Sequence, residues 1–243
     1  MNSSEVKPYN QQDKSKKEEV AEMFNNISVR YDFLNHFLSL GIDKLWRKKA
    51  IRQLRDHHPK KIIDIATGTG DFALAALKLD PEEVIGLDIS SGMLAVGEQK
   101  MLKKKVNFII KMQLGDSENI PYTDGYFDAL TVGFGVRNFE HLEVGLSEML
   151  RVLKPGGKAV ILEFSKPKHF PIKQLFGFYS RYFIPFFGKR ISKDVQAYSY
   201  LPASVAAFPE GKDFEAILMK IGYKDIQSIL VSGGIATIYS GIK

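Results

Sequence analysis

The chain alternates short apolar runs with segments whose apolar residues recur at helical spacing. Five of these runs are rich in β-branched residues, which is typical of buried strands. The predicted strands cover residues 61–66, 83–89, 106–112, 127–134 and 158–164. The predicted helices cover residues 71–78, 92–104, 141–153 and 213–221. Strands that alternate with helices in this way favour right-handed crossovers and a parallel sheet.

The end of the chain follows a different pattern. Two strand-like segments, residues 225–231 and 235–242, flank the pair Gly233-Gly234, which predicts an antiparallel hairpin. The five parallel strands and this hairpin together predict a seven-stranded, mostly parallel α/β sheet of the Rossmann-like kind.

The segment before the first strand has no place in that sheet. Residues 1–18 are polar and charged, so we expect a disordered tail. Residues 19–26 and 43–54 have helical spacing, and the second of these helices would bury Trp46 and Ala50 on one face. We expect residues 19–58 to form a helical cap over the ligand site. Residues 59–243 would form the main domain, with an insert at about 168–208.

The main chemical signal lies between the first predicted strand and the helix that follows it. Thr67-Gly68-Thr69-Gly70 forms a tight glycine turn there. Glycine lets a ligand approach the backbone, and a helix N-terminus offers unpaired N–H groups. Asp88 ends the second strand about 20 residues further on, where a carboxylate suits ribose hydroxyls. The same spacing fits a nicotinamide-dependent oxidoreductase, and titration with NAD would test that alternative.

Asp64 favours a different nucleotide cofactor. A charge in the middle of a buried strand is costly unless it is used. The run Asp64-x-Ala-Thr-Gly-Thr-Gly70, together with Asp88, resembles motif I and the acidic partner of class I S-adenosylmethionine (SAM) methyltransferases. The resemblance implies that SAM is the methyl donor and that Asp64 supports the glycine loop and the methionine end of SAM. Ala66 stands where many members have a glycine.

The third predicted strand adds further candidates. Gly115-Asp116-Ser117 follows it, at the edge of the sheet where the other strand ends meet. We expect Asp116 and Ser117 to reach the adenine of the cofactor, and the alternative for Asp116 is a simple turn cap. The predicted cofactor-binding residues are Asp64, Gly68, Thr69, Gly70, Asp88, Asp116 and Ser117.

Three stretches point to one family within that class. Residues 135–138 read Gly-Val-Arg-Asn, residues 31–46 run from Tyr-Asp-Phe-Leu-Asn to Trp46, and residues 151–165 contain Lys-Pro-Gly-Gly and Leu-Glu-Phe-Ser. Together they resemble the signatures of the ubiquinone/menaquinone-biosynthesis C-methyltransferases. Asp43 departs from that pattern, which has histidine there, and Gly133 replaces a serine that some relatives have.

The resemblance implies a reaction and roles for three residues. The expected reaction moves a methyl group from SAM to a ring carbon of a polyprenylated quinol, with demethylmenaquinol as first choice. The ubiquinone-pathway 2-polyprenyl-6-methoxy-1,4-benzoquinol is the second. Arg137 would stabilise a phenolate, Asn138 would hold a quinol oxygen, and Tyr31 would position the ring. A structural salt bridge for Arg137 and a packed core position for Tyr31 are the alternatives, and Glu163 is a further candidate base.

Composition narrows these possibilities. Cysteine is absent and the five histidines are scattered, which argues against a thiol nucleophile and against a metal site. We expect a cytoplasmic protein, since no run of 18 apolar residues and no apolar leader appear.

The net charge of +6 is concentrated in one segment. Residues 166–194 contain seven Lys or Arg and one acid, and residues 170–193 contain eight aromatic residues. We expect this segment to shelter the polyprenyl tail as a lid and to contact anionic lipid at the inner face of the membrane. Alternatives are packing into the core, a homodimer interface, or a membrane- or RNA-binding module. No nucleic-acid partner is expected, because no recognisable nucleic-acid motif is present.

Overall fold

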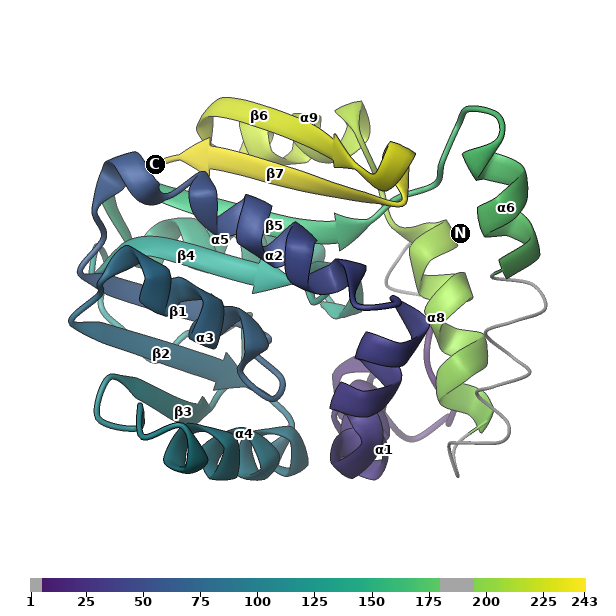
Figure 1. The fold of residues 1–243 in the computed structure, drawn as a ribbon, viewed down its shortest axis with the longest axis horizontal. Coiled ribbons are helices and arrows are strands. Elements are labelled where there is room, and N and C mark those ends of the chain that lie inside the picture. Colours follow the sequence, from purple (N-terminus) through teal and green to yellow (C-terminus); the bar gives the residue numbers. More distant parts are fainter. Residues whose placement is uncertain (1–5, 180–194) are drawn as a thin grey trace.

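The computed structural model describes residues 6–179 and 195–243, and within them the chain forms one seven-stranded sheet (Figure 1). The strand order is β3-β2-β1-β4-β5-β7-β6. The strands are β1 (Lys61–Ile65), β2 (Glu83–Asp88), β3 (Ile110–Leu114), β4 (Phe127–Gly133), β5 (Leu153–Phe164), β6 (Lys224–Val231) and β7 (Ala236–Ile242). The pairs among β1 to β5 are parallel, whereas β7 runs antiparallel to both β5 and β6. This arrangement confirms the predicted fold class.

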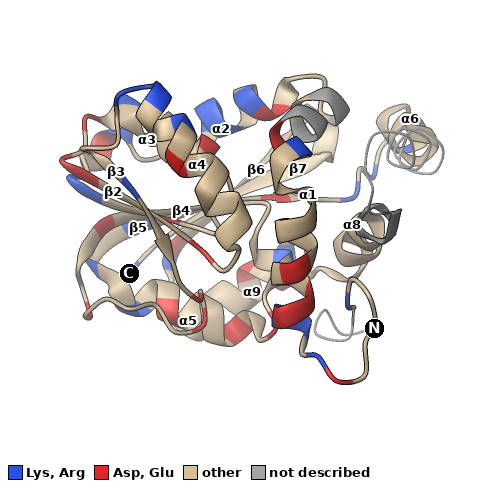
Figure 2. Ribbon diagram, turned by 90° about the horizontal axis from the view of Figure 1, so that it is seen from below, with Lys and Arg blue, Asp and Glu red and all other residues tan. Residues whose placement is uncertain are grey.

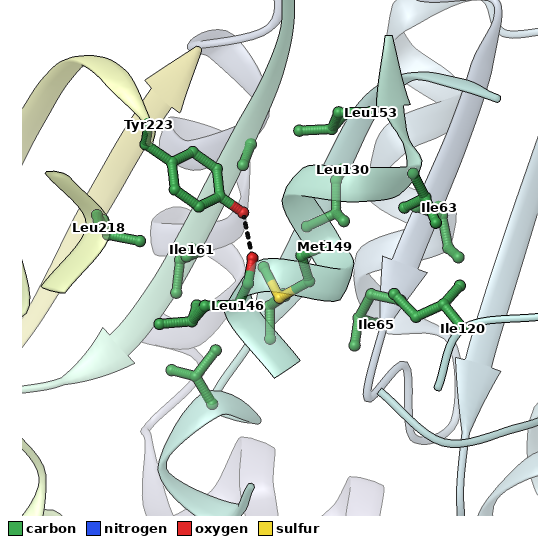
Figure 3. Close-up of a cluster of buried hydrophobic side chains, with 14 of the residues drawn as sticks. Ile63, Ile65, Ile120, Leu130, Leu146, Met149, Leu153, Ile161, Leu218 and Tyr223 are labelled. Carbon is green, nitrogen blue, oxygen red and sulfur yellow. Dashed lines mark hydrogen bonds between the residues drawn. The ribbon is translucent and has the colours of Figure 1, made fainter. Parts of the chain in front are cut away.

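Side chains alternate between the two faces of the sheet along each strand, so both faces present apolar side chains. Helices cover both faces. On one face, Ile63, Ile65 and Ile161 belong to a hydrophobic cluster that includes Met149 of α5 (Leu142–Val152) and Leu218 of α9 (Lys212–Ile221), as Figure 3 shows. On the other face, Ile62 belongs to a second cluster that includes residues of α2 (Ile42–Arg52), α3 (Asp71–Ala76) and α4 (Ser91–Lys103). These two hydrophobic clusters fix the positions of the strand ends.

The third strand begins four residues later than the sequence pattern predicts, at Ile110 instead of residue 106. Lys105 has a left-handed backbone with φ of 55°, and the carbonyl of Val106 accepts hydrogen bonds from the N–H groups of Ile109 and Ile110. Residues 106–109 are therefore a turn. Val106 and Ile109 still pack on the core, which explains the apolar pattern that suggested a strand.

The N-terminal segment differs most from the expectation. A single helix, α1 (Lys16–Leu38), replaces the short helix predicted over 19–26, and it begins inside the segment expected to be disordered. Ser15 and Glu18 form a reciprocal capping box: the Ser15 N–H donates to Glu18, and Ser15 Oγ accepts from the Glu18 N–H. The fully buried Glu19 carboxylate accepts the backbone N–H groups of residues 9–11, so the chain before α1 folds back on it.

The helix α2 lies on the sheet rather than over the strand ends. It buries Trp46, Ala50 and Ile51, and the Trp46 indole N–H donates to Ser232 Oγ at 2.8 Å. The part of the predicted cap that covers the strand ends is therefore α1.

The insert contributes two described helices, α6 (Ile172–Phe178) and α8 (Val195–Ala207). Figures 1 and 2 show α8 beside α1, at the carboxyl ends of the parallel strands, and Tyr200 of α8 packs with Val20 and Met23 of α1. Among the described helices, none combines the length and apolar character that crossing a membrane requires.

Candidate cofactor and substrate site

A cavity of about 650 Å³ opens at the carboxyl ends of β1, β2 and β4, beneath α1. It brings together residues that are far apart in the sequence, as expected for a doubly wound sheet. The predicted site residues that line it are Tyr31, Gly68, Asp88, Asp116, Ser117 and Asn138. Asp64 and Thr69 line an adjoining cavity of about 390 Å³, which Tyr31 and Gly68 also border. Gly70 and Arg137 line neither cavity.

The two glycines of the loop after β1 have different roles. Both have a left-handed backbone, with φ of 59° at Gly68 and 83° at Gly70. A Cβ on Gly68 would meet no atom within 4 Å, so its backbone stays open to a ligand in the cavity. A Cβ on Gly70 would lie 2.3 Å from the terminal methyl of Met101, which would have to move, and the positive φ itself favours glycine at this position. Ala66 also adopts a left-handed backbone, with φ of 50°.

Asp64 holds this loop from below. Its fully buried carboxylate accepts hydrogen bonds from Thr67 Oγ1 at 2.6 Å, Thr131 Oγ1 at 2.7 Å and the Ala73 N–H at 3.1 Å. It thereby joins the glycine loop, β4 and the first turn of α3. Burial disfavours the charged form and raises the pKa of Asp64 to about 7, although these hydrogen bonds oppose the shift.

The raised pKa predicts how stability depends on pH. Between its ordinary value of 3.8 and about 7, Asp64 stays protonated in the folded protein and is ionised in the unfolded chain. The folded state then binds more protons, so its stability falls as pH rises through that window. We expect the stability of wild type relative to Asp64→Asn to be greatest near pH 4 and to decline by at least about 1 kcal/mol by pH 7. Urea unfolding of both proteins across this range measures it, and a pH-independent difference would contradict it.

Asp88 connects the end of β2 to the glycine loop. One carboxylate oxygen accepts the Gly68 N–H at 2.7 Å, and the other accepts the Ser90 N–H at 2.8 Å. The side chain is 9% exposed and faces the cavity, and burial raises its pKa. Asp88 therefore fixes the loop and also presents a carboxylate to the cavity.

Asp116 combines the two roles considered from the sequence. It caps its own turn, because one oxygen accepts the Glu118 N–H at 2.9 Å, and it also lines the cavity. Its other oxygen accepts a hydrogen bond from the Lys17 ammonium at 2.5 Å. Lys17 comes from the first turn of α1 and itself lines the cavity, but it belongs to the segment that composition marked as disordered.

Arg137 lies behind the cavity rather than on its wall. Its guanidinium is 2.8 Å from Glu163 Oε1 and donates to the Phe134 carbonyl, and Nε has no hydrogen-bond partner among the described residues. Both side chains of the pair are buried. Burial raises the pKa of Glu163, and the neighbouring Arg137 charge opposes this shift. This arrangement is the salt bridge considered as the alternative, and it fixes the loop that carries the next residue.

Asn138 ends the short 3-10 turn η4 (Val136–Asn138) and lines the cavity. Its Oδ1 accepts the hydroxyl of Tyr200 at 3.1 Å, and its Nδ2 donates to the Phe134 carbonyl at 3.4 Å. Tyr31 of α1 lines the same cavity, and burial raises the pKa of the Tyr31 phenol to about 12.

The helix α1 is tied to the site by contacts that no sequence motif indicated. Asn25 Oδ1 accepts from Ser90 Oγ and from the Gly92 N–H, both at 2.8 Å. The ammonium of Lys16 is fully buried and donates to the carbonyls of Arg137 and Phe139, at 3.2 and 2.9 Å. The cap thus holds the ends of both β2 and β4.

The adjoining cavity is bordered by an ionic network. Within the described ranges, His36, Asp43 and Asp71 are close enough to share a metal ion. The Arg47 guanidinium, however, contacts both carboxylates, so they already have a cationic partner. Asp43 also pairs with His36 at 2.9 Å. The arrangement gives no support to a resident metal.

Comparison with known proteins gives consistent matches. The model described as "ubiE/COQ5 methyltransferase family" matches residues 11–243. The chain is 49% identical over 239 residues to a demethylmenaquinone methyltransferase of Bacteroides fragilis, covering 98% of this chain and 97% of the relative. It is 43% identical to a ubiquinone/menaquinone biosynthesis C-methyltransferase of Geobacter sulfurreducens, covering 94% and 90%. A SAM-dependent methyltransferase from Thermotoga maritima shares the fold, with a TM-score of 0.62, 18% identity and coverage of 91% and 99%.

Proposed function

The chain belongs to the ubiE/COQ5 methyltransferase family, and on that premise we propose that it methylates a ring carbon of demethylmenaquinol, using SAM as methyl donor. The observation that carries the substrate choice is the 49% identity, over nearly the whole of both chains, to a protein named for demethylmenaquinone. The relative from Geobacter is named for both ubiquinone and menaquinone biosynthesis. The ubiquinone-pathway methoxy-benzoquinol is therefore the second candidate.

The cavity fits SAM by its chemistry. Asp88 offers a carboxylate for ribose hydroxyls, Asp116 and Ser117 offer polar groups for the adenine, and Gly68 leaves room beside the backbone. Thr69 and Gly70 complete the loop, which Asp64 supports from below. When bound, SAM supplies an electrophilic methyl group. We assign cofactor binding to these residues on that basis.

The residues around the rest of the cavity must activate a weak carbon nucleophile. Loss of a hydroxyl proton from the quinol to solvent leaves an oxyanion that pushes electron density onto the ring. A ring carbon then forms a bond to the methyl group as the methyl–sulfur bond of SAM breaks, which leaves S-adenosylhomocysteine, and the methylated carbon loses its proton to solvent to restore the aromatic ring. Donors aimed at the developing oxyanion lower the barrier most when water is excluded. We propose that Asn138 donates to this oxygen, that Tyr31 orients the ring, and that Arg137 supports the Asn138 loop through its pair with Glu163.

Direct assay tests the substrate assignment. Purified protein is incubated with SAM and either reduced demethylmenaquinol or the methoxy-benzoquinol, each with a short prenyl tail, and the products are identified by mass. We expect kcat/KM to be at least about tenfold higher for demethylmenaquinol. The opposite preference would select the second candidate. Methylation of neither, by protein that binds SAM, would overturn the quinol assignment.

A polyprenyl substrate also requires access to lipid, and α6 together with the residues just before it offers a surface for this contact. Phe170 and Leu175 are 81% and 65% exposed, and Lys168 and Lys173 are exposed beside them. We propose that this surface makes a peripheral contact with anionic lipid and that the insert serves as a lid over the tail. The predicted aromatic residues Tyr182, Phe183, Phe186 and Phe187 lie outside the described residues.

Vesicle binding tests the lipid contact. We expect the double variant Phe170→Ser/Leu175→Ser to bind anionic vesicles at least about tenfold more weakly than wild type, because both apolar side chains would lose their burial in lipid. Phe108→Ser is the matched control, since Phe108 is 73% exposed on another part of the surface and should not affect binding. Equal loss in both variants would contradict the proposal. Light scattering distinguishes the homodimer alternative, in which the double variant would dissociate a dimer instead.

A further inference from the structure

The hydroxyl of Tyr200 lies against the cavity wall without belonging to any motif of the sequence. Tyr200 is on α8 of the insert and is 4% exposed. Its ring packs with Val20 and Met23 of α1, and its Oη is 3.1 Å from Oδ1 of Asn138. It is therefore held by the cap and touches a wall residue of the cavity.

The Phe134 carbonyl and the Tyr200 hydroxyl together determine which end of the Asn138 amide faces which neighbour, because the carbonyl can only accept and therefore takes the N–H end. Burial raises the pKa of the Tyr200 phenol, so the hydroxyl stays protonated and can donate to the other end. The amide oxygen is the group that accepts it, which leaves the NH2 group on the other side. One of its two N–H groups donates to the Phe134 carbonyl at 3.4 Å, and the second remains for a partner in the cavity.

The orientation matters for the chemistry. A quinol oxygen that loses its proton becomes an anion, and an N–H donor stabilises it, whereas an amide carbonyl in the same place would repel it. We propose that Tyr200 is a positioning residue that holds the Asn138 amide with its N–H toward the quinol oxygen. This inference rests on the proposed function, because it assumes that a quinol occupies the cavity.

Tyr200→Phe tests the role of the hydroxyl while keeping the ring. Without the hydroxyl, only the 3.4 Å bond to the Phe134 carbonyl holds the amide, which then spends part of its time with its N–H turned away from the quinol oxygen. We expect kcat for quinol methylation to fall about tenfold, with the SAM dissociation constant unchanged within about twofold. The matched control is Tyr223→Phe. Tyr223 is 3% exposed and its hydroxyl donates to the Leu146 carbonyl at 3.1 Å, in the core cluster shown in Figure 3. Its variant should lose stability but keep kcat.

A double-mutant cycle separates positioning from a general structural effect. If Tyr200 acts through Asn138, Tyr200→Phe should cost less than about twofold in kcat when it is added to Asn138→Ala. Additive losses would overturn the proposal, as would wild-type kcat in Tyr200→Phe.

A second variant tests the donor without depending on the stability of α8. Asn138→Asp keeps an acceptor for Tyr200 but has no N–H, so it should lose as much turnover as Asn138→Ala. Near-normal turnover in Asn138→Asp would refute the donor role. Failure of wild-type protein to methylate either quinol would instead refute the proposed function, so the two failures can be told apart.

Discussion

Replacing Glu163 with alanine is expected to lower the free energy of unfolding by about 3–5 kcal/mol, because it leaves the Arg137 guanidinium buried without its partner. Glu163 is fully buried, Arg137 is 7% exposed, and the two are 2.8 Å apart. Arg137→Ala is expected to cost a similar amount, since it strands the carboxylate. Urea unfolding at pH 7 measures both. The exposed pair Lys220–Glu143 provides the control, and Glu143→Ala should cost less than about 1 kcal/mol.

The double variant Arg137→Met/Glu163→Leu separates stability from catalysis. Replacing both charges by apolar residues of similar size should restore most of the lost stability, because no uncompensated charge remains. If Arg137 only supports the loop, turnover per folded molecule should stay within about tenfold of wild type. If the guanidinium acts directly on the quinolate, turnover should fall by about a hundredfold or more. A double variant no more stable than Glu163→Ala would contradict the account of the pair.

The sheet could be predicted because each of its strands appears in the sequence as a separate apolar run. Parallel strands buried on both faces read as continuous runs of apolar residues, and the helices between them leave few topologies. The third strand was misplaced because Val106 and Ile109 are apolar for a different reason: they pack on the core from a turn. An apolar pattern reports burial, and the backbone conformation must be inferred from other signals.

Composition alone does not predict the structure of the N-terminal segment. Its many charged residues suggested solvent, yet Glu19 and Lys16 are buried because each has backbone groups as partners. The Ser15-x-x-Glu18 capping box was present in the sequence and marks the true start of α1. A local motif with a physical mechanism was the better guide here.

Site residues that directly follow a strand could be predicted, because ligands bind at the carboxyl ends of the strands in such a sheet. Asp88, Asp116 and Asn138 follow three different strands, and the sheet brings them to one cavity. The contacts of Lys17 and Tyr200 depend on how α1 and α8 pack over the sheet, and no spacing along the chain encodes that packing. Arg137 shows that the direction of a side chain cannot be predicted from its place in the sequence. It follows β4 as predicted, but its side chain pairs with Glu163 and does not line the cavity.

Asp88→Ala is expected to weaken SAM binding by about 1–3 kcal/mol, which corresponds to a roughly 5- to 150-fold higher dissociation constant. Ribose hydroxyls buried beside alanine would have no acceptor. The Gly68 N–H would also lose its partner, so the glycine loop would be less well ordered before SAM binds. Titration calorimetry with SAM measures the change, and unchanged affinity would show that the ribose lies elsewhere in the cavity.

Asp128→Ala is the control. It removes a carboxylate that contributes to the fold but lies away from the cavity. Asp128 also accepts two backbone N–H groups, those of Lys60 and Lys61, at 3.0 and 2.7 Å. It lies where β1 and β4 begin, at the opposite edge of the sheet from the cavity. Both variants should lower the melting temperature, because each leaves N–H groups without an acceptor. Only Asp88→Ala should change the affinity for SAM, and a similar loss of affinity in Asp128→Ala would mean that global destabilisation, rather than a ribose contact, explains the result.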